Sequence, residues 1–124
     1  MILVDTSVWV DHLRAGDPAV AAALERGAVL MHPFVIGELA CGNLKKRSEV
    51  LWLLAELPAA PVATAQEALT FIARHALMGR GIGYVDVHLL AAVALAGSGA
   101  RLWTRDRRLA AVATQLKLSL SEPK

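Results

Sequence analysis

The sequence predicts an α/β fold, an open, mostly parallel sheet of four or five short strands with helices on both faces. The first observation is that short apolar runs alternate along the chain with longer segments of helical spacing. The second is the run at 1–4, which is apolar throughout and therefore typical of a strand buried on both faces of a parallel sheet. Right-handed crossovers between such strands place helices on both sides of the sheet.

Turn and cap residues divide the first half of the chain into two strands and four helices. Pro18 stands in the first turn of the second expected helix and Gly27 ends it, while Pro58 ends the fourth. The third and fourth helices are expected to pair as a helical hairpin. In order, the expected elements are strand 1–4, helices 7–13 and 18–26, strand 28–31, and helices 34–41 and 49–57.

The second half of the chain continues the same alternation of strands and helices. Thr64, followed three residues later by Glu67, is a capping-box pattern that predicts the start of a helix. Gly97 and Gly99 mark the end of the next, nearly uniformly apolar helix. The expected elements are a short strand at 61–62, helices 64–78 and 85–96, strand 101–104, helix 107–115 and strand 116–120.

The length of 124 residues suits a single domain, 1–124, with one core. At 56% hydrophobic and 19% charged residues, the chain has more apolar surface than such a core can hide, so a partner or a dimer is expected to cover the excess. No apolar stretch approaches the ~20 residues that span a bilayer. The start lacks the pattern of a signal peptide and Cys41 is the single cysteine, which predicts a cytoplasmic protein without disulfides.

The net charge of +2 does not by itself suggest a nucleic-acid partner. If four of the 11 acidic residues gather in one pocket, however, the remaining surface carries 13 basic and 7 acidic groups. Such a surface would suit a phosphate backbone, although a run of charge is more often a solvated face. The basic clusters are Lys45, Lys46 and Arg47, and Arg105, Arg107 and Arg108.

Two acidic residues lie just past predicted strands. Asp5 comes after the first strand and Asp106 after the strand 101–104. Ligands of open α/β sheets bind in the crevice beyond the carboxyl ends of the strands, so both side chains are expected to face that crevice. The alternative is that each acid caps the helix that follows it.

Two further acids lie within apolar helical segments. Glu38 is surrounded by apolar residues, where an unpaired carboxylate would be costly to bury. A salt bridge to an Arg or Lys is the alternative explanation for Glu38. Asp86 has the same character, and its alternative is a favourable interaction with the helix dipole in the first turn.

Four carboxylates within about 6 Å would repel by roughly 3 kcal/mol per pair at an effective dielectric near 20. A domain that is only about 5–15 kcal/mol stable cannot absorb this, so protonation or a cation must intervene. A site of oxygen ligands alone suits Mg²⁺ or Mn²⁺, whereas zinc usually recruits His or Cys. The four histidines show no metal-ligand spacing with one another. They are His12, His32, His75 and His88.

The chain resembles the PIN-domain nucleases, most closely the VapC-type toxins of bacterial toxin-antitoxin pairs. The resemblance covers nearly the whole chain and rests on four short motifs in the family's order, Ile2–Ser7, Gly37–Leu39, Gly83–Asp86 followed by Leu89–Ala92, and Leu102–Asp106. It implies a PIN-like sheet and metal ligation by the acidic quartet, Asp5, Glu38, Asp86 and Asp106. It also implies that Thr6 and Thr104 support the site by hydrogen bonds, while Trp103 replaces a more usual aliphatic residue.

The resemblance further implies a metal-dependent RNA endonuclease in which Mg²⁺ or Mn²⁺ activates water. Cleavage would leave a 5′-phosphate and a 3′-hydroxyl, and the two basic clusters would follow the RNA backbone. As a toxin, such a protein forms a homodimer and is held inactive by a cognate VapB-type antitoxin. The expected groove for the antitoxin is the helical hairpin 34–57.

Two other functions remain open at this point. A non-catalytic binding or regulatory module with the same fold is possible, although the complete quartet argues against it. A phospho-acceptor or phosphatase domain would use Asp5 as a nucleophile. Such domains commonly place a second acid close to the first, whereas Thr6 and Ser7 follow Asp5 here.

Overall fold

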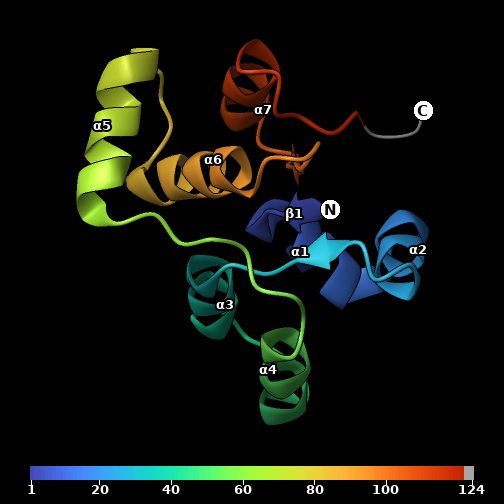
Figure 1. The fold of residues 1–124 in the computed structure, drawn as a ribbon. Coiled ribbons are helices and arrows are strands. Elements are labelled where there is room, and N and C mark those ends of the chain that lie inside the picture. Colours follow the sequence, from blue (N-terminus) through green and yellow to red (C-terminus); the bar gives the residue numbers. More distant parts are fainter. Residues whose placement is uncertain (122–124) are drawn as a thin grey trace.

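A parallel sheet of three strands lies at the centre of the computed structural model, which describes residues 1–121 (Figure 1). The strands are β1 (Ile2–Val4), β2 (Val29–Leu30) and β3 (Arg101–Trp103), in the order β2-β1-β3. Leu3 of the central strand pairs with Leu30 on one side and with Leu102 on the other. The first apolar run therefore forms a strand of a parallel sheet, as its composition predicts, and it is the central one.

Within residues 1–121, seven helices surround the sheet, and each lies where the sequence predicts a helix. They are α1 (Thr6–Ala15), α2 (Pro18–Glu25), α3 (Pro33–Ala40), α4 (Arg47–Ala55), α5 (Ala65–His75), α6 (Tyr84–Ala96) and α7 (Arg107–Gln115). The capping box at α5 is present, because the Thr64 hydroxyl accepts from the Glu67 amide and the Glu67 carboxylate accepts from the Thr64 amide. α5 ends three residues before the predicted Met78, since Ala76 takes a left-handed conformation (φ 52°).

Two of the expected strands are wrong. Segments 61–62 and 116–120 form no strand, so the sheet within residues 1–121 has three strands instead of four or five. Near each segment only a single parallel bridge forms, between Met31 and Ala59 and between Leu102 and Ser119. Pro61 has no amide hydrogen to donate, and Lys117 takes a left-handed conformation (φ 61°), so neither segment can extend its bridge into a ladder.

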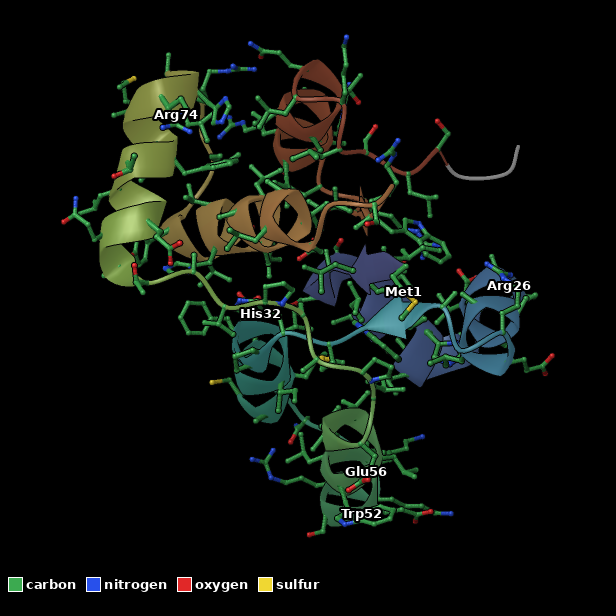
Figure 2. All side chains as sticks on the ribbon, viewed as in Figure 1. Met1, Arg26, His32, Trp52, Glu56 and Arg74 are labelled. Atoms are coloured by element: carbon green, nitrogen blue, oxygen red, sulfur yellow. The ribbon has the colours of Figure 1, made fainter. Side chains whose placement is uncertain are left out.

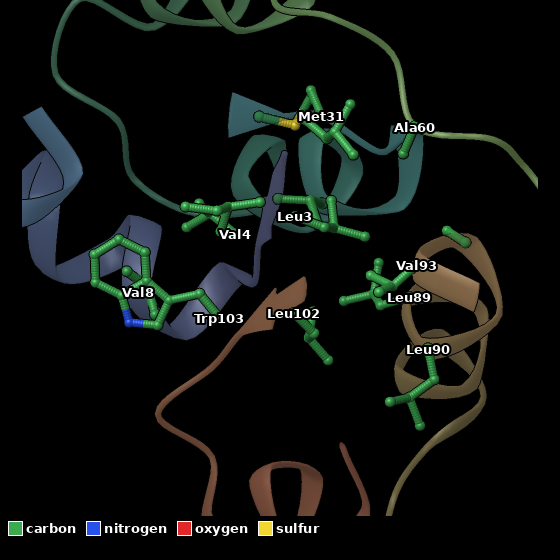
Figure 3. Packing of buried hydrophobic residues seen from close by; sticks show 14 of the residues in the cluster. Leu3, Val4, Val8, Met31, Ala60, Leu89, Leu90, Val93, Leu102 and Trp103 are labelled. Carbon is green, nitrogen blue, oxygen red and sulfur yellow. The ribbon is translucent and has the colours of Figure 1, made fainter. Parts of the chain in front are cut away.

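Helices cover both faces of the sheet, as predicted. Figure 3 shows Leu3 and Leu102 on the side of Leu89 of α6, whereas Val4 and Trp103 point toward Val8 of α1. All of these side chains are buried. Because successive side chains of a strand point to opposite faces, a sheet covered on both sides needs apolar residues at every position.

The carboxyl end of the sheet gathers the ends of several elements. The Asp5 amide, one residue beyond β1, donates to the Trp103 carbonyl at the end of β3 (2.9 Å). The chain segments that follow these two strands are thereby held side by side. None of the helices in residues 1–121 is long and apolar enough to cross a membrane.

Candidate active site

Asp5 lies at the carboxyl end of β1 and is only 6% exposed. It occupies the N-cap position of α1, but its side chain makes no capping hydrogen bond to that helix. Its Oδ2 instead accepts from two hydroxyl groups, Thr104 Oγ1 (2.7 Å) and Ser7 Oγ (2.8 Å). The helix-cap explanation therefore does not account for this carboxylate, whose orientation is set by hydroxyls from both ends of the chain.

Ser7 is a site residue that the sequence reasoning missed. Its hydroxyl donates to Asp5 and also accepts from the backbone amide of Arg105 (3.0 Å). It lies in the first turn of α1, two residues after Asp5, so its hydroxyl returns to the carboxylate that precedes the helix. A serine directly after the Asp5-Thr6 pair was the available signal.

Glu38 lies on α3 and is exposed, in contrast to the apolar surroundings expected from the sequence. Its neighbours Val35 and Leu39 are buried, so α3 turns those residues toward the core and Glu38 away from it. Glu38 Oε1 accepts from Thr6 Oγ1 (2.7 Å). No Lys or Arg in the described part of the chain forms an ion pair with Glu38, so the salt-bridge alternative is not what the structure contains.

Asp86 and Asp106 each serve a helix start as well. Asp106 is the N-cap of α7 and accepts from the Leu109 amide (2.9 Å), while Asp86 in the first turn of α6 accepts from the Gly83 amide (3.1 Å). Both acids therefore do stabilise the start of a helix, as the alternative explanations for them proposed. Each bond occupies one carboxylate oxygen, Oδ1 of Asp106 and Oδ2 of Asp86, which leaves each acid a second oxygen for another role.

The four acids share one electrostatic environment. The pKa of Asp86 is raised, first because burial disfavours the charged carboxylate and further because the negative charges of Asp5, Asp106 and Glu38 act on it. The hydrogen bond from the Gly83 amide opposes this rise. Residues that are up to 101 positions apart in the sequence are thus brought together at one end of the sheet.

The donor set fits a hard divalent cation. All four groups are carboxylates, and within residues 1–121 none of them forms an ion pair with a Lys or Arg that would neutralise it. As their side chains stand, no three acidic, His or Cys groups in the described ranges lie close enough to hold one ion. Hydrogen bonds instead hold Asp5, Glu38, Asp86 and Asp106 on the hydroxyl and amide donors described above.

The basic residues are placed differently from one another. Lys45, Lys46, Arg107 and Arg108 are exposed, and Arg47 is exposed while donating to the Ala40 carbonyl. Arg105, by contrast, is only 29% exposed in its side chain and pairs with two carboxylates, Asp11 and Asp17. An RNA-binding role stays a prediction for the exposed residues, whereas the guanidinium of Arg105 is directed into the protein.

Two largely apolar grooves lie along α1 and α4, and one of them borders Glu38. The first, of about 330 Å³, is bordered by Glu38, Leu13 and Val50. The second, of about 190 Å³, shares Leu13 and Val50 with the first and extends to Leu53. Trp52 of α4 is 64% exposed (Figure 2). Apolar surface next to an acidic site is therefore open to a partner on this side of the molecule.

Comparison with known proteins agrees with this architecture. A family model described as PIN domain matches residues 2–115. The chain is similar to two proteins named Ribonuclease VapC32, from the CDC 1551 / Oshkosh and H37Rv strains of Mycobacterium tuberculosis. Each is 52% identical over 122 residues, which cover 98% of both chains. It is also similar to the crystal structure of PAE2754 from Pyrobaculum aerophilum, with a TM-score of 0.61 at 20% identity over 96% of this chain and 87% of the other.

Proposed function

This chain belongs to the PIN-domain family, and on that basis we propose that it is a metal-dependent RNA endonuclease that acts as the toxin of a toxin-antitoxin pair. The observation that carries the proposal is the acidic quartet: the charges of Asp5, Glu38 and Asp106 act on Asp86, and none of the four carboxylates has a basic partner within residues 1–121. Relatives that are 52% identical along nearly the whole chain are named ribonucleases, which supports RNA as the substrate.

Asp5, Glu38, Asp86 and Asp106 would hold the Mg²⁺ or Mn²⁺. When bound, the metal supplies a water of lowered pKa and positive charge for the phosphate and the leaving oxygen. The hydroxyl of Thr6 orients the carboxylate of Glu38, and those of Ser7 and Thr104 orient that of Asp5. These hydrogen bonds restrict both side chains to one rotamer.

In the proposed reaction, water adds to phosphorus and the bond to the 3′ oxygen breaks. The leaving 3′ oxygen takes a proton from solvent, so the products are a 5′-phosphate and a 3′-hydroxyl. The water's proton passes to a carboxylate of the quartet, since no histidine or lysine hydrogen-bonds to these acids within residues 1–121.

Cleavage of total cellular RNA by the purified protein, freed of partner proteins by denaturation and refolding, tests the function. We expect discrete cuts with Mg²⁺ or Mn²⁺ that EDTA abolishes and added metal restores. Sequencing of the new ends should find 5′-phosphates. If the folded protein cuts no RNA with either metal, the nuclease proposal is wrong and a non-catalytic binding module becomes the better explanation.

The antitoxin is the partner that we propose for the two grooves along α1 and α4. Apolar side chains of its tail would fill the grooves, and a basic side chain would lie beside Glu38, which borders the first groove. The homodimer and the cytoplasmic location implied by the resemblance are likewise retained as proposals.

Leu53→Asp tests the groove, because this side chain is 52% exposed and lines it. We expect at least a tenfold rise in the dissociation constant of the toxin-antitoxin complex, since burying one leucine is worth about 1.5–3 kcal/mol. Leu69→Asp, at 56% exposure on α5, is the matched control and should bind as the unmodified chain does. Leu54 is unsuitable because it is buried in the core. Unchanged affinity of Leu53→Asp would remove this groove from consideration.

A further inference from the structure

Arg105 lies between two residues of the site but sends its own side chain elsewhere. Its Nη1 donates to Asp11 Oδ2 on α1 (2.7 Å), and its Nη2 donates to Asp17 Oδ2 at the start of α2 (2.6 Å). Its guanidinium carbon also lies 5.8 Å from the centre of the Trp103 ring. The short turn after β3 is thereby fastened to two helices from the beginning of the chain.

The backbone of the same turn makes the contacts that the site needs. The Arg105 amide donates to Ser7 Oγ (3.0 Å), and the Asp106 amide donates to Thr104 Oγ1 (3.1 Å). Both of these hydroxyls donate in turn to Asp5 Oδ2. A shift of the turn would therefore change the hydrogen bonds of Asp5 and the place of Asp106 together.

Asp17 is a firm anchor because it is held from two sides. Its Oδ1 accepts from the Ala19 and Val20 amides and so caps α2, which leaves Oδ2 for Arg105. The hydrogen bond from Arg105 is the main reason why the pKa of Asp17 is lowered. With only 17% of its side chain exposed, Asp17 forms a better-ordered pair than an ordinary surface salt bridge.

We propose that Arg105 is a positioning residue of the proposed nuclease, and that its pairing with Asp11 and Asp17 holds Thr104 and Asp106 in register with Asp5. This inference rests on the proposed function. It assigns to Arg105 a role different from that of the exposed basic residues, because a guanidinium that binds two carboxylates at 2.6 and 2.7 Å is not available to a phosphate.

A double-mutant cycle with Arg105→Met and Asp17→Asn tests the positioning role. Asn is as good an N-cap as Asp, so Asp17→Asn keeps the cap of α2 and removes only the charge that holds Arg105. We expect each single variant to lower kcat about tenfold, the double variant to fall no further, and the dissociation constant for an uncleavable RNA to stay within twofold. Arg26→Met, an exposed site at the far end of α2 (Figure 2), is the control for loss of one positive charge and should leave kcat unchanged.

Amide hydrogen exchange supplies a readout that does not depend on cleavage. The amides of Arg105 and Asp106 should exchange at least tenfold faster in Arg105→Met and Asp17→Asn than in Arg26→Met, because the turn is released from its anchors.

Weaker RNA binding in Arg105→Met, with normal cleavage in Asp17→Asn, would overturn the proposal and make Arg105 an RNA contact. Unchanged exchange and unchanged kcat in both variants would overturn it as well. If the unmodified chain fails to cleave RNA while exchange responds as expected, the proposed function fails but the anchoring of the turn stands.

Discussion

Asp5→Asn is expected to lower the rate of RNA cleavage on the order of 10³-fold while leaving the fold intact. The asparagine carbonyl oxygen can still accept from Thr104 and Ser7, so the shape of this buried position is kept. What the variant lacks is the negative charge at the place where the quartet would hold its cation. Because that charge also repels Asp86, its loss should not lower the thermal midpoint of the metal-free protein.

The measurement is the initial rate at saturating RNA and fixed Mg²⁺, beside the unfolding midpoint of the same preparations. Glu25→Gln, a loss of one negative charge on the exposed end of α2, is the matched control and should cleave at the unmodified rate. A rate for Asp5→Asn within a few-fold of the control would show that this carboxylate does not bind the catalytic metal.

Acidification from pH 7 to pH 4 is expected to lower the free energy of unfolding by up to about 3 kcal/mol through His32 alone. The ring is fully buried, and its Nδ1 accepts from the Phe34 amide at the start of α3, whereas its Nε2 has no hydrogen-bond partner within residues 1–121. Burial, with a smaller contribution from His88, lowers the pKa of His32 to about 4. The folded protein therefore keeps this ring neutral.

Acid lowers the stability because the unfolded chain binds a proton at His32 more readily than the folded chain does. In the unfolded chain the ring takes up a proton below its ordinary pKa of 6.5, but in the folded chain only near pH 4. Between these values protons favour the unfolded state, so the stability due to neutral His32 is complete above pH 6.5 and is lost as the pH falls toward 4.

Denaturant unfolding of His32→Asn at pH 7 and pH 4.5 isolates this effect. Asn keeps an acceptor for the Phe34 amide but does not titrate, so the difference in stability between the two pH values should shrink. His75→Asn, which removes a half-buried histidine from the end of α5, should keep the full difference. All carboxylates are present in the unmodified chain and in both variants, so their contribution to the loss of stability cancels in the comparison. If His32→Asn loses as much stability on acidification as the unmodified chain, His32 is not the group responsible.

The helices were the most predictable part of the fold because their ends carry local chemical signals. Pro18, Gly27 and the Thr64–Glu67 capping box mark boundaries that depend on neighbouring residues alone. The segments 61–62 and 116–120 were predicted wrongly as strands, because a short apolar run carries no periodicity that distinguishes a strand from an extended segment with one bridge. Whether such a run joins a sheet depends on tertiary contacts.

The site was predictable where it follows from position along a strand or helix. Asp5 and Asp106 were placed at the sheet edge by the strands that precede them, but the exposure of Glu38 depends on which face of α3 packs against the core. The partners of Arg105 lie 88 and 94 residues away in sequence, so no local pattern could distinguish this partly buried pairing from a solvated basic run.

The order of the strands has a consequence for the time at which activity can arise during synthesis. β1 is made first but occupies the middle of the sheet, and its neighbour β3, with Thr104 and Asp106 behind it, is made almost last. At about 5–20 residues per second, the ribosome has worked for several seconds before the second half of the site exists. A prematurely terminated chain that lacks residues 101–106 has neither Asp106 nor the hydrogen bond from Thr104 to Asp5, so the nuclease that we propose should stay inactive until the last strand docks.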